Sequence, residues 1–170
     1  MNFINKPVRN TERQSFPQSA SPAAHEILIA DANVKDLGIL LAELNPGVAK
    51  WLVKRGDDAI GLIHQALSIP GLKTLHLLAH GSPGKICLGG RAITAADFRS
   101  RFDGAAVRDL DIAFWSCRTG AHQAGREFVQ AVAEATGARV ATAQGLVGSA
   151  DKGGSWHLSA AVGAPFSDQA

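Results

Sequence analysis

Apolar residues along the chain follow two alternating patterns: short unbroken runs, and longer segments in which they recur every three or four positions. The short runs are typical of buried strands and fall at residues 27–30, 48–53, 72–79, 111–115, 139–143 and 155–160. Helical spacing occupies 34–44, 59–67 and the segment that Gly137 closes, and Thr94 with Asp97 indicates a further helix start. This alternation predicts an α/β protein with a mostly parallel sheet and helices on both faces.

The same pattern predicts one folded domain between two tails. Residues 1–25 contain three prolines and no periodicity, which indicates a flexible N-terminal tail. The domain is expected over residues 26–162, followed by a C-terminal tail at 163–170. A glycine-rich stretch at 81–90 encloses Lys85–Leu88 and predicts a small hairpin. A length of 170 residues suits a single hydrophobic core.

Composition narrows the possible partners. The chain is 46% hydrophobic and 19% charged, with a net charge of +2 and no tyrosine. Basic residues are scattered, so binding to nucleic acid is not expected. No window approaches the roughly 20 apolar residues that a membrane span needs.

The cysteine count and the first residues bear on localisation. Two cysteines, Cys87 and Cys117, cannot form a disulfide framework, and free thiols fit a reducing compartment. Residues 1–10 lack the apolar core of a secretory signal. We therefore expect a cytoplasmic protein if this is the native start, and a secreted or surface-associated one if the chain is a piece of a larger protein.

Two reactive residues follow apolar strands: His80 comes after the run 72–79, and Cys117 comes shortly after 111–115. Reacting groups in open parallel α/β sheets collect beyond the carboxyl ends of the strands, so we expect the two residues to share one rim. Taken singly, a cysteine in this position is more often a small packing residue and a histidine a loop residue. Together they suggest a nucleophile with an acid/base partner.

Each requirement of cysteine catalysis has a candidate in this sequence. Cys117 leads toward the long helix, whose positive N-terminal end favours a thiolate. His80 can protonate a departing amine. The backbone amides of Gly81 and Cys117 are the candidate donors for an oxyanion hole.

Four further residues are candidates for substrate binding: Asp31, Ser82, Gln144 and Asp151. Asp31 ends the first strand and could receive a basic substrate side chain, although capping of the next segment, alone or with Asn33, is the competing interpretation. Gln144 and Asp151 belong to the glycine-rich loop before the last strand.

Other chemistries fit the spacing less well. His76, His80 and Cys117 are a weak metal set because the two histidines lie four residues apart on a strand, and neither a metal nor a cofactor is predicted. Cys87 is expected to be a packing residue. A thiol phosphatase needs an arginine six positions after its cysteine, where this chain has Gln123. Gly81–Gly84 is one residue short of a serine-hydrolase elbow.

The order of these pieces resembles the caspase–gingipain–legumain superfamily of cysteine peptidases, through His80-Gly81 and Ser116-Cys117 at two strand ends. The wider sequence is most similar to a bacterial caspase-like domain of unknown function found at the N-termini of large surface adhesins. That similarity rests on residues 29–31, 78–84, 135–141 and 153–156, and on Cys117 with Gly125 and Phe128-Val129. The resemblance implies a three-layer fold with strand order 2-1-3-4-5-6 and cleavage of peptide bonds.

The sequence therefore predicts a cysteine endopeptidase with a His80–Cys117 dyad and a protein or peptide substrate, either its own chain or a partner. The alternative is a non-catalytic caspase-like module that binds a partner protein.

Overall fold

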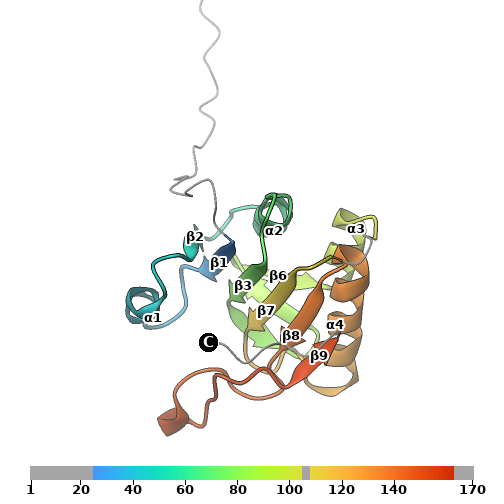
Figure 1. The fold of residues 1–170 in the computed structure, drawn as a ribbon. Coiled ribbons are helices and arrows are strands. Elements are labelled where there is room, and N and C mark those ends of the chain that lie inside the picture. Colours follow the sequence, from blue (N-terminus) through green and yellow to red (C-terminus); the bar gives the residue numbers. More distant parts are fainter. Residues whose placement is uncertain (1–24, 105–107, 163–170) are drawn as a thin grey trace, which may run out of the picture.

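A six-stranded sheet forms the centre of the protein in the computed structural model, which describes residues 25–104 and 108–162 (Figure 1). Its strands run in the order β2-β1-β3-β7-β8-β9, with β1 at Glu26–Asp31, β2 at Ala49–Val53, β3 at Thr74–Leu78, β7 at Asp111–Trp115, β8 at Arg139–Thr142 and β9 at Ala160–Val162. The first five are parallel, and β9 is antiparallel to β8. The predicted α/β class, parallel sheet and strand order are confirmed. The predicted tails lie outside the described residues, except for His25.

The position predicted for the last strand is wrong. Residues 155–159 belong to a loop, and the strand begins only at Ala160. Ser155 is held away from the sheet because its amide donates to the carbonyl of Leu146 at 2.9 Å. The run that looks like a strand in the sequence instead pairs with the other half of its own loop, through a bridge between Val147 and Ser155.

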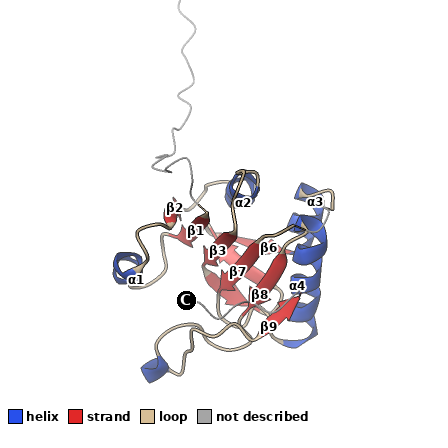
Figure 2. Cartoon of the chain, viewed as in Figure 1, coloured by secondary structure: helices blue, strands red, loops and turns tan. Residues whose placement is uncertain are grey.

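Helices cover both faces of the sheet (Figure 2). They are α1 at Leu37–Glu43, α2 at Ala59–Leu67, α3 at Ala95–Arg101 and α4 at His122–Thr136, with a short 3₁₀ turn at Ala150–Lys152. α1 is shorter than predicted because Asp36 has φ 58°, outside the helical range. α3 begins with the predicted capping box, in which the amide of Thr94 donates to the Asp97 carboxylate at 2.8 Å.

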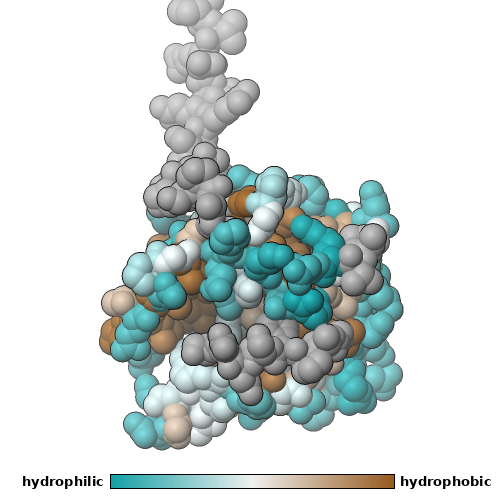
Figure 3. Space-filling view, viewed as in Figure 1, coloured by the Kyte–Doolittle hydropathy of each residue, from teal (hydrophilic) through white to brown (hydrophobic). Residues whose placement is uncertain are grey.

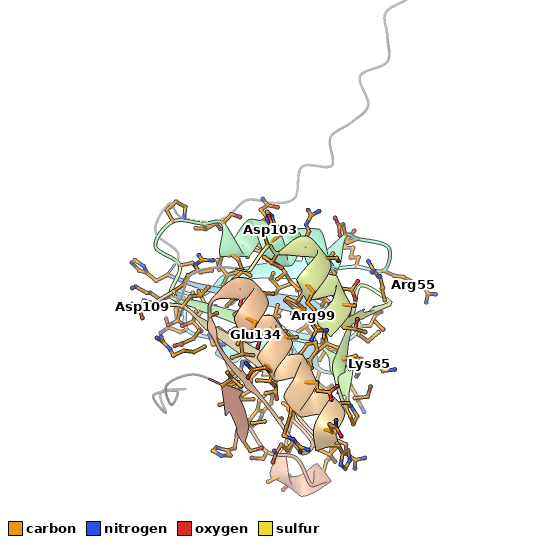
Figure 4. The ribbon with its side chains drawn as sticks, turned by 90° about the vertical axis from the view of Figure 1, so that its right-hand side faces the viewer. Arg55, Lys85, Arg99, Asp103, Asp109 and Glu134 are labelled. Atoms are coloured by element: carbon orange, nitrogen blue, oxygen red, sulfur yellow. The ribbon has the colours of Figure 1, made fainter. Side chains whose placement is uncertain are left out.

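The larger core lies between the sheet and helices α2, α3 and α4. Alternate strand residues such as Ile29, Leu77 and Phe114 point into it and are fully buried. Phe114 meets Phe98 of α3 and Phe128 of α4 edge to face, with ring centroids 5.2–6.2 Å apart. The outer surfaces of these helices carry charged side chains, including Arg99 and Glu134 (Figure 4).

The opposite face of the sheet carries a smaller core. Leu28, Ala30 and Leu78 point to this side and pack with the leucines of α1. Apolar surface around α1 is visible in Figure 3, and Ile39 on this helix is 63% exposed. No helix within the described residues is both long enough and apolar enough to cross a bilayer.

A second, three-stranded antiparallel sheet packs against the larger core. It contains β4 at His80–Ser82, β5 at Lys85–Leu88 and β6 at Arg91–Thr94. The predicted hairpin is thus present, and His80 begins an additional strand that the sequence pattern did not indicate. Ile86, Leu88 and Ile93 face the core and are buried, which fixes this small sheet against the body.

Phe114→Ala is expected to lower the free energy of unfolding by about 3–5 kcal/mol, because it opens a cavity where three aromatic rings meet. Urea denaturation measures the change. Leu52→Ala is the control, since Leu52 is 46% exposed and its loss should cost less than about 1 kcal/mol. Equal losses from both substitutions would contradict the assignment of Phe114 to the centre of the core.

Candidate functional site

The carboxyl ends of β3 and β7 bring His80 and Cys117 to one rim of the sheet. Leu78 and Trp115 are paired in the parallel register, and each reactive residue follows two positions later. The amide of Ala79 still donates to the carbonyl of Trp115 at 3.3 Å. Beyond it, a Cβ placed on Gly81 would lie 2.8 Å from the carbonyl oxygen of Cys117. The two segments are therefore in direct contact, as the sequence predicts.

The Cys117 thiol is half-buried and contacts a backbone segment of the loop between β8 and β9. The amide of Val147 points at Sγ from 3.4 Å, and the carbonyl oxygen of the same residue lies 3.8 Å from Sγ. Arg118 anchors the loop, because its amide donates to the carbonyl of Gly145 at 2.7 Å.

The backbone amide of Cys117 itself has no hydrogen-bond acceptor among the residues that the structure describes. Arg118, the next residue, has φ 57°, an uncommon conformation for a side chain with a Cβ. Such conformations cluster where a loop must present a particular group. The turn after β7 thus leaves an amide next to the sulfur available to a ligand.

The helix support predicted for Cys117 is more remote than expected. α4 begins at His122, five residues after the cysteine, because residues 118–121 form a turn closed by the amide of Ala121 and the carbonyl of Arg118. Gly120 and Gly125 are packed so closely that a Cβ on Gly125 would lie 2.1 Å from the carbonyl carbon of Gly120. The field of a helix end fades within about one turn, so the nearer donor to the sulfur is Val147.

His80 is exposed at the first position of β4, and its ring makes no hydrogen bond within the described residues. In the antiparallel register it lies directly opposite Cys87. The expectation that Cys87 is a packing residue is wrong, since this thiol is exposed. The signal was available in the sequence: His80 and Cys87 are equally distant from Pro83-Gly84, and a two-residue turn there pairs them.

Position 81 must be glycine because β4 and the turn after β7 approach each other closely there. A Cβ at this position would lie 2.3 Å from Oγ1 of Thr119 and 2.9 Å from Cβ of Ser116. Hydrogen-bonded and non-bonded pairs alternate along an antiparallel ladder, and the pair Ser82–Lys85 closes the turn. Gly81 and its partner Ile86 therefore form the next pair, which shares no backbone hydrogen bonds, and the amide of Gly81 points away from β5. It remains a candidate oxyanion donor beside Cys117.

Asp31 is placed differently from the substrate-binding residue that the sequence suggested. Its side chain is buried and both carboxylate oxygens are occupied. Oδ1 accepts from the amide and the side chain of Asn33 at 2.8 and 3.0 Å, and Oδ2 accepts from the amide of Gly89 at 2.8 Å. Asp31 therefore joins the end of β1 to the turn between β5 and β6, and it is not open to a substrate side chain.

The other three predicted substrate-binding residues belong to different parts of the structure around His80 and Cys117. Ser82 is half-buried on β4, two residues from His80. Gln144 is exposed beside Gly145, and its amide hydrogen-bonds to Oγ of Ser159 at 3.2 Å. Asp151 belongs to the 3₁₀ turn that projects from the sheet in Figure 1. The structure thus brings Ser82 to the rim and leaves Asp151 at the tip of its loop.

His76 has a separate environment on the face of β3 that α1 covers in part. Its Nδ1 accepts from Nε1 of Trp115 at 3.1 Å, and its Nε2 is 3.7 Å from a carboxylate oxygen of Glu26. Burial lowers the pKa of His76 below its ordinary value, and the negative charges of Glu26 and Asp111 oppose this only in part. The ring is therefore engaged as a neutral hydrogen-bond acceptor.

Fold and site together define an α/β domain with a histidine–cysteine pair at the carboxyl rim of a parallel sheet. Residues 27–170 match the family described as a domain of unknown function (DUF4347), and the chain belongs to this family. No curated protein and no solved structure matches the chain.

Stability is expected to fall as the pH drops below 6.5, the pKa of an unperturbed histidine. Because the pKa of His76 is lower in the fold, the unfolded chain binds the proton first. The contribution of this residue is complete above pH 6.5 and declines until the folded pKa is reached. Urea midpoints between pH 5 and 7 measure it. His76→Asn, which keeps an acceptor for Trp115 but does not titrate, should flatten the profile; an unchanged slope would assign the effect elsewhere.

Asp31→Asn is expected to destabilise the fold by about 1–3 kcal/mol, because an amide group cannot accept from all three donors that the carboxylate satisfies. Thermal or urea unfolding measures the loss. Asp151→Asn is the matched control at an exposed position and should have no measurable effect. A stable Asp31→Asn protein would instead return Asp31 to the list of substrate-binding candidates.

Proposed function

We propose that this domain is a cysteine endopeptidase in which Cys117 is the nucleophile and His80 the general acid and base. The observation that carries the proposal is the parallel register of β3 and β7, which sets both residues two positions beyond paired strand ends. The close contact of Gly81 with the backbone of Cys117 brings the two loops together at that point. The strand order agrees with the one that the caspase resemblance implies.

The reaction follows from these roles. His80 accepts the proton of the Cys117 thiol as the sulfur attacks the carbonyl carbon of the scissile peptide bond, and the oxyanion receives hydrogen bonds from the amides of Gly81 and Cys117. His80 donates a proton to the amide nitrogen as the C–N bond breaks, and the amine product leaves. The remaining thioester is hydrolysed by a water molecule that gives its proton to His80. The C–S bond then breaks, His80 returns its proton to the departing sulfur, and the acid product and the free thiol are released.

Several features of the site support this assignment. The Cys117 amide is available for an oxyanion, since it has no acceptor among the described residues. The Val147 amide donates to the sulfur at 3.4 Å and places the backbone of the loop between β8 and β9 beside it. His80 is exposed, and its ring makes no hydrogen bond to any residue within 25–104 or 108–162, so it can turn toward a substrate. The chemistry needs no cofactor, and its substrate is a peptide segment of this chain or of a partner protein.

One observation favours the second candidate, a non-catalytic module that binds a partner protein. The nearest polar contacts of the Cys117 sulfur are with the backbone of Val147, and His80 makes no hydrogen bond to it. If the His80 ring never reaches the Cys117 sulfur, the rim of the sheet could still bind a partner protein but would not cleave it. Histidine–nucleophile contacts in ligand-free sites are often long, which is why we rank the peptidase first.

The proposal is tested by mass spectrometry of the products from an unbiased peptide library. The wild-type protein should cleave a subset of peptides, and Cys117→Ala should abolish this cleavage. His80→Ala should lower kcat/KM by roughly 10²–10⁴-fold, the usual contribution of a general acid and base. Cleavage that persists in Cys117→Ala would contradict the assignment of the nucleophile.

Thiol labelling separates the two candidates without a substrate. In a Cys87→Ser protein the remaining thiol is Cys117, and its reaction with iodoacetamide at pH 7 should be faster than that of Cys87 in a Cys117→Ala protein. Adding His80→Ala should slow the Cys117 reaction. Equal rates for the two thiols, together with intact peptides in the library experiment, would favour the binding module.

A further inference from the structure

Thr119 is a buried residue whose hydroxyl has no role in the proposed reaction. It lies two positions after Cys117 and is fully buried. Its Oγ1 lies 2.7 Å from Oγ of Ser116 and donates to the carbonyl oxygen of Lys85 at 3.4 Å. Because a carbonyl oxygen can only accept, the single hydroxyl proton of Thr119 goes to Lys85, and Ser116 donates to Thr119. The hydroxyl thus joins the turn after β7 to the hairpin of β4 and β5.

The turn after β7 is attached to the rest of the molecule on two sides. The amides of Arg118 and Gly120 donate to main-chain carbonyls just after β8, at 2.7 and 2.9 Å. Thr119, between them, is bound to the hairpin, where its own carbonyl oxygen accepts from the amide of Gly84 at 3.0 Å. Removal of the Thr119 hydroxyl therefore weakens only the attachment to the hairpin, because the bonds of its two neighbours do not involve it.

The hairpin carries one of the two candidate oxyanion donors, and the turn carries the other. A Cβ on Gly81 would lie 2.3 Å from Oγ1 of Thr119 and 2.8 Å from the carbonyl oxygen of Cys117. The Thr119 hydroxyl therefore packs against Gly81 and sets how closely β4 approaches the turn. Two amides can bind one oxyanion only if each lies about 2.7–3.1 Å from it, so the separation of the Gly81 and Cys117 amides must be kept.

We propose that Thr119 is a positioning residue, which holds the amide of Gly81 in place relative to that of Cys117 so that both reach the oxyanion. The inference rests on the proposed function and adds to it a residue whose hydroxyl is bonded to neither member of the His80–Cys117 pair. This role is separate from the surroundings of the thiol, because the polar contacts of the sulfur are with Val147. A misplacement of about 1 Å can cost about 10²-fold in rate, so even a partial shift of the hairpin lowers turnover measurably.

The test compares Thr119→Val, which keeps the shape of the side chain without its hydroxyl, with Thr119→Ser, which keeps the hydroxyl. On a peptide that the wild-type protein cleaves, Thr119→Val should lower kcat at least about tenfold and leave KM nearly unchanged. Thr119→Ser should keep a kcat close to that of the wild type. The matched control is Thr136→Val, since Thr136 is also buried and its hydroxyl donates to the carbonyl of Val132 within α4 at 2.7 Å. This control should lose stability and keep its kcat.

A second measurement separates a misplaced oxyanion donor from a misplaced sulfur. A peptide aldehyde forms a C–S bond to Cys117, and the thiol proton passes to its former carbonyl oxygen, which occupies the oxyanion position. Alkylation of the same thiol by iodoacetamide releases iodide and forms no oxyanion. In a Cys87→Ser background, Thr119→Val should raise the inhibition constant of the aldehyde at least about tenfold and leave the rate of alkylation unchanged.

The outcomes distinguish the positioning role from the peptidase itself. Equal kcat values for Thr119→Val and Thr136→Val, measured per folded molecule, would overturn the role of Thr119 and leave the function in place. An equal loss in Thr119→Ser, or a weaker aldehyde matched by slower alkylation, would overturn it too. If Thr119→Val does not fold, Thr119→Ala replaces it with the same expected results. Absence of Cys117-dependent cleavage by the wild-type protein would overturn both inferences together.

Discussion

The parallel pairing of β3 with β7 is the constraint on which the site depends. Because Leu78 and Trp115 are held in register by the sheet, the chain that leaves each strand starts from a fixed point, and two residues are enough to reach His80 and Cys117. The pairing is rigid for reasons unrelated to chemistry: Leu77 and Phe114 are fully buried beneath it. Core packing thus determines the separation of two side chains that do not themselves touch the core.

The fold was largely predictable because its strands are apolar runs that differ from the helices in period. The position of the last strand was wrong because pairing within a loop competes with the sheet: Ser155 begins a segment of strand-like composition, but its own amide donates to the carbonyl of Leu146. The length of α1 was also overestimated, since no periodicity reveals the backbone conformation of Asp36. Local patterns show which residues are buried, and they say less about which partner a backbone amide finds.

The candidate site was predictable in part for the same reason. Strand ends locate His80 and Cys117, but the role of Asp31 depends on an element distant in sequence, and the exposure of Cys87 depends on which face of its hairpin the core covers. Asp31 is engaged by Gly89, 58 residues away, so its burial follows from the small sheet and not from its own strand. Cys87 looked like a packing residue because an alternating strand of four residues does not reveal which of its faces is covered.

The contact between Val147 and the Cys117 sulfur is made entirely by main-chain atoms of the loop. Any residue other than proline could supply the same amide. The residue type at position 147 can therefore change, whereas the place of its backbone beside the sulfur must be kept. What must be inherited is the number of residues between β8 and that point, and the turn that Gly145 anchors. Among homologous sequences, insertions and deletions in this loop would therefore be more informative about the sulfur's surroundings than substitutions.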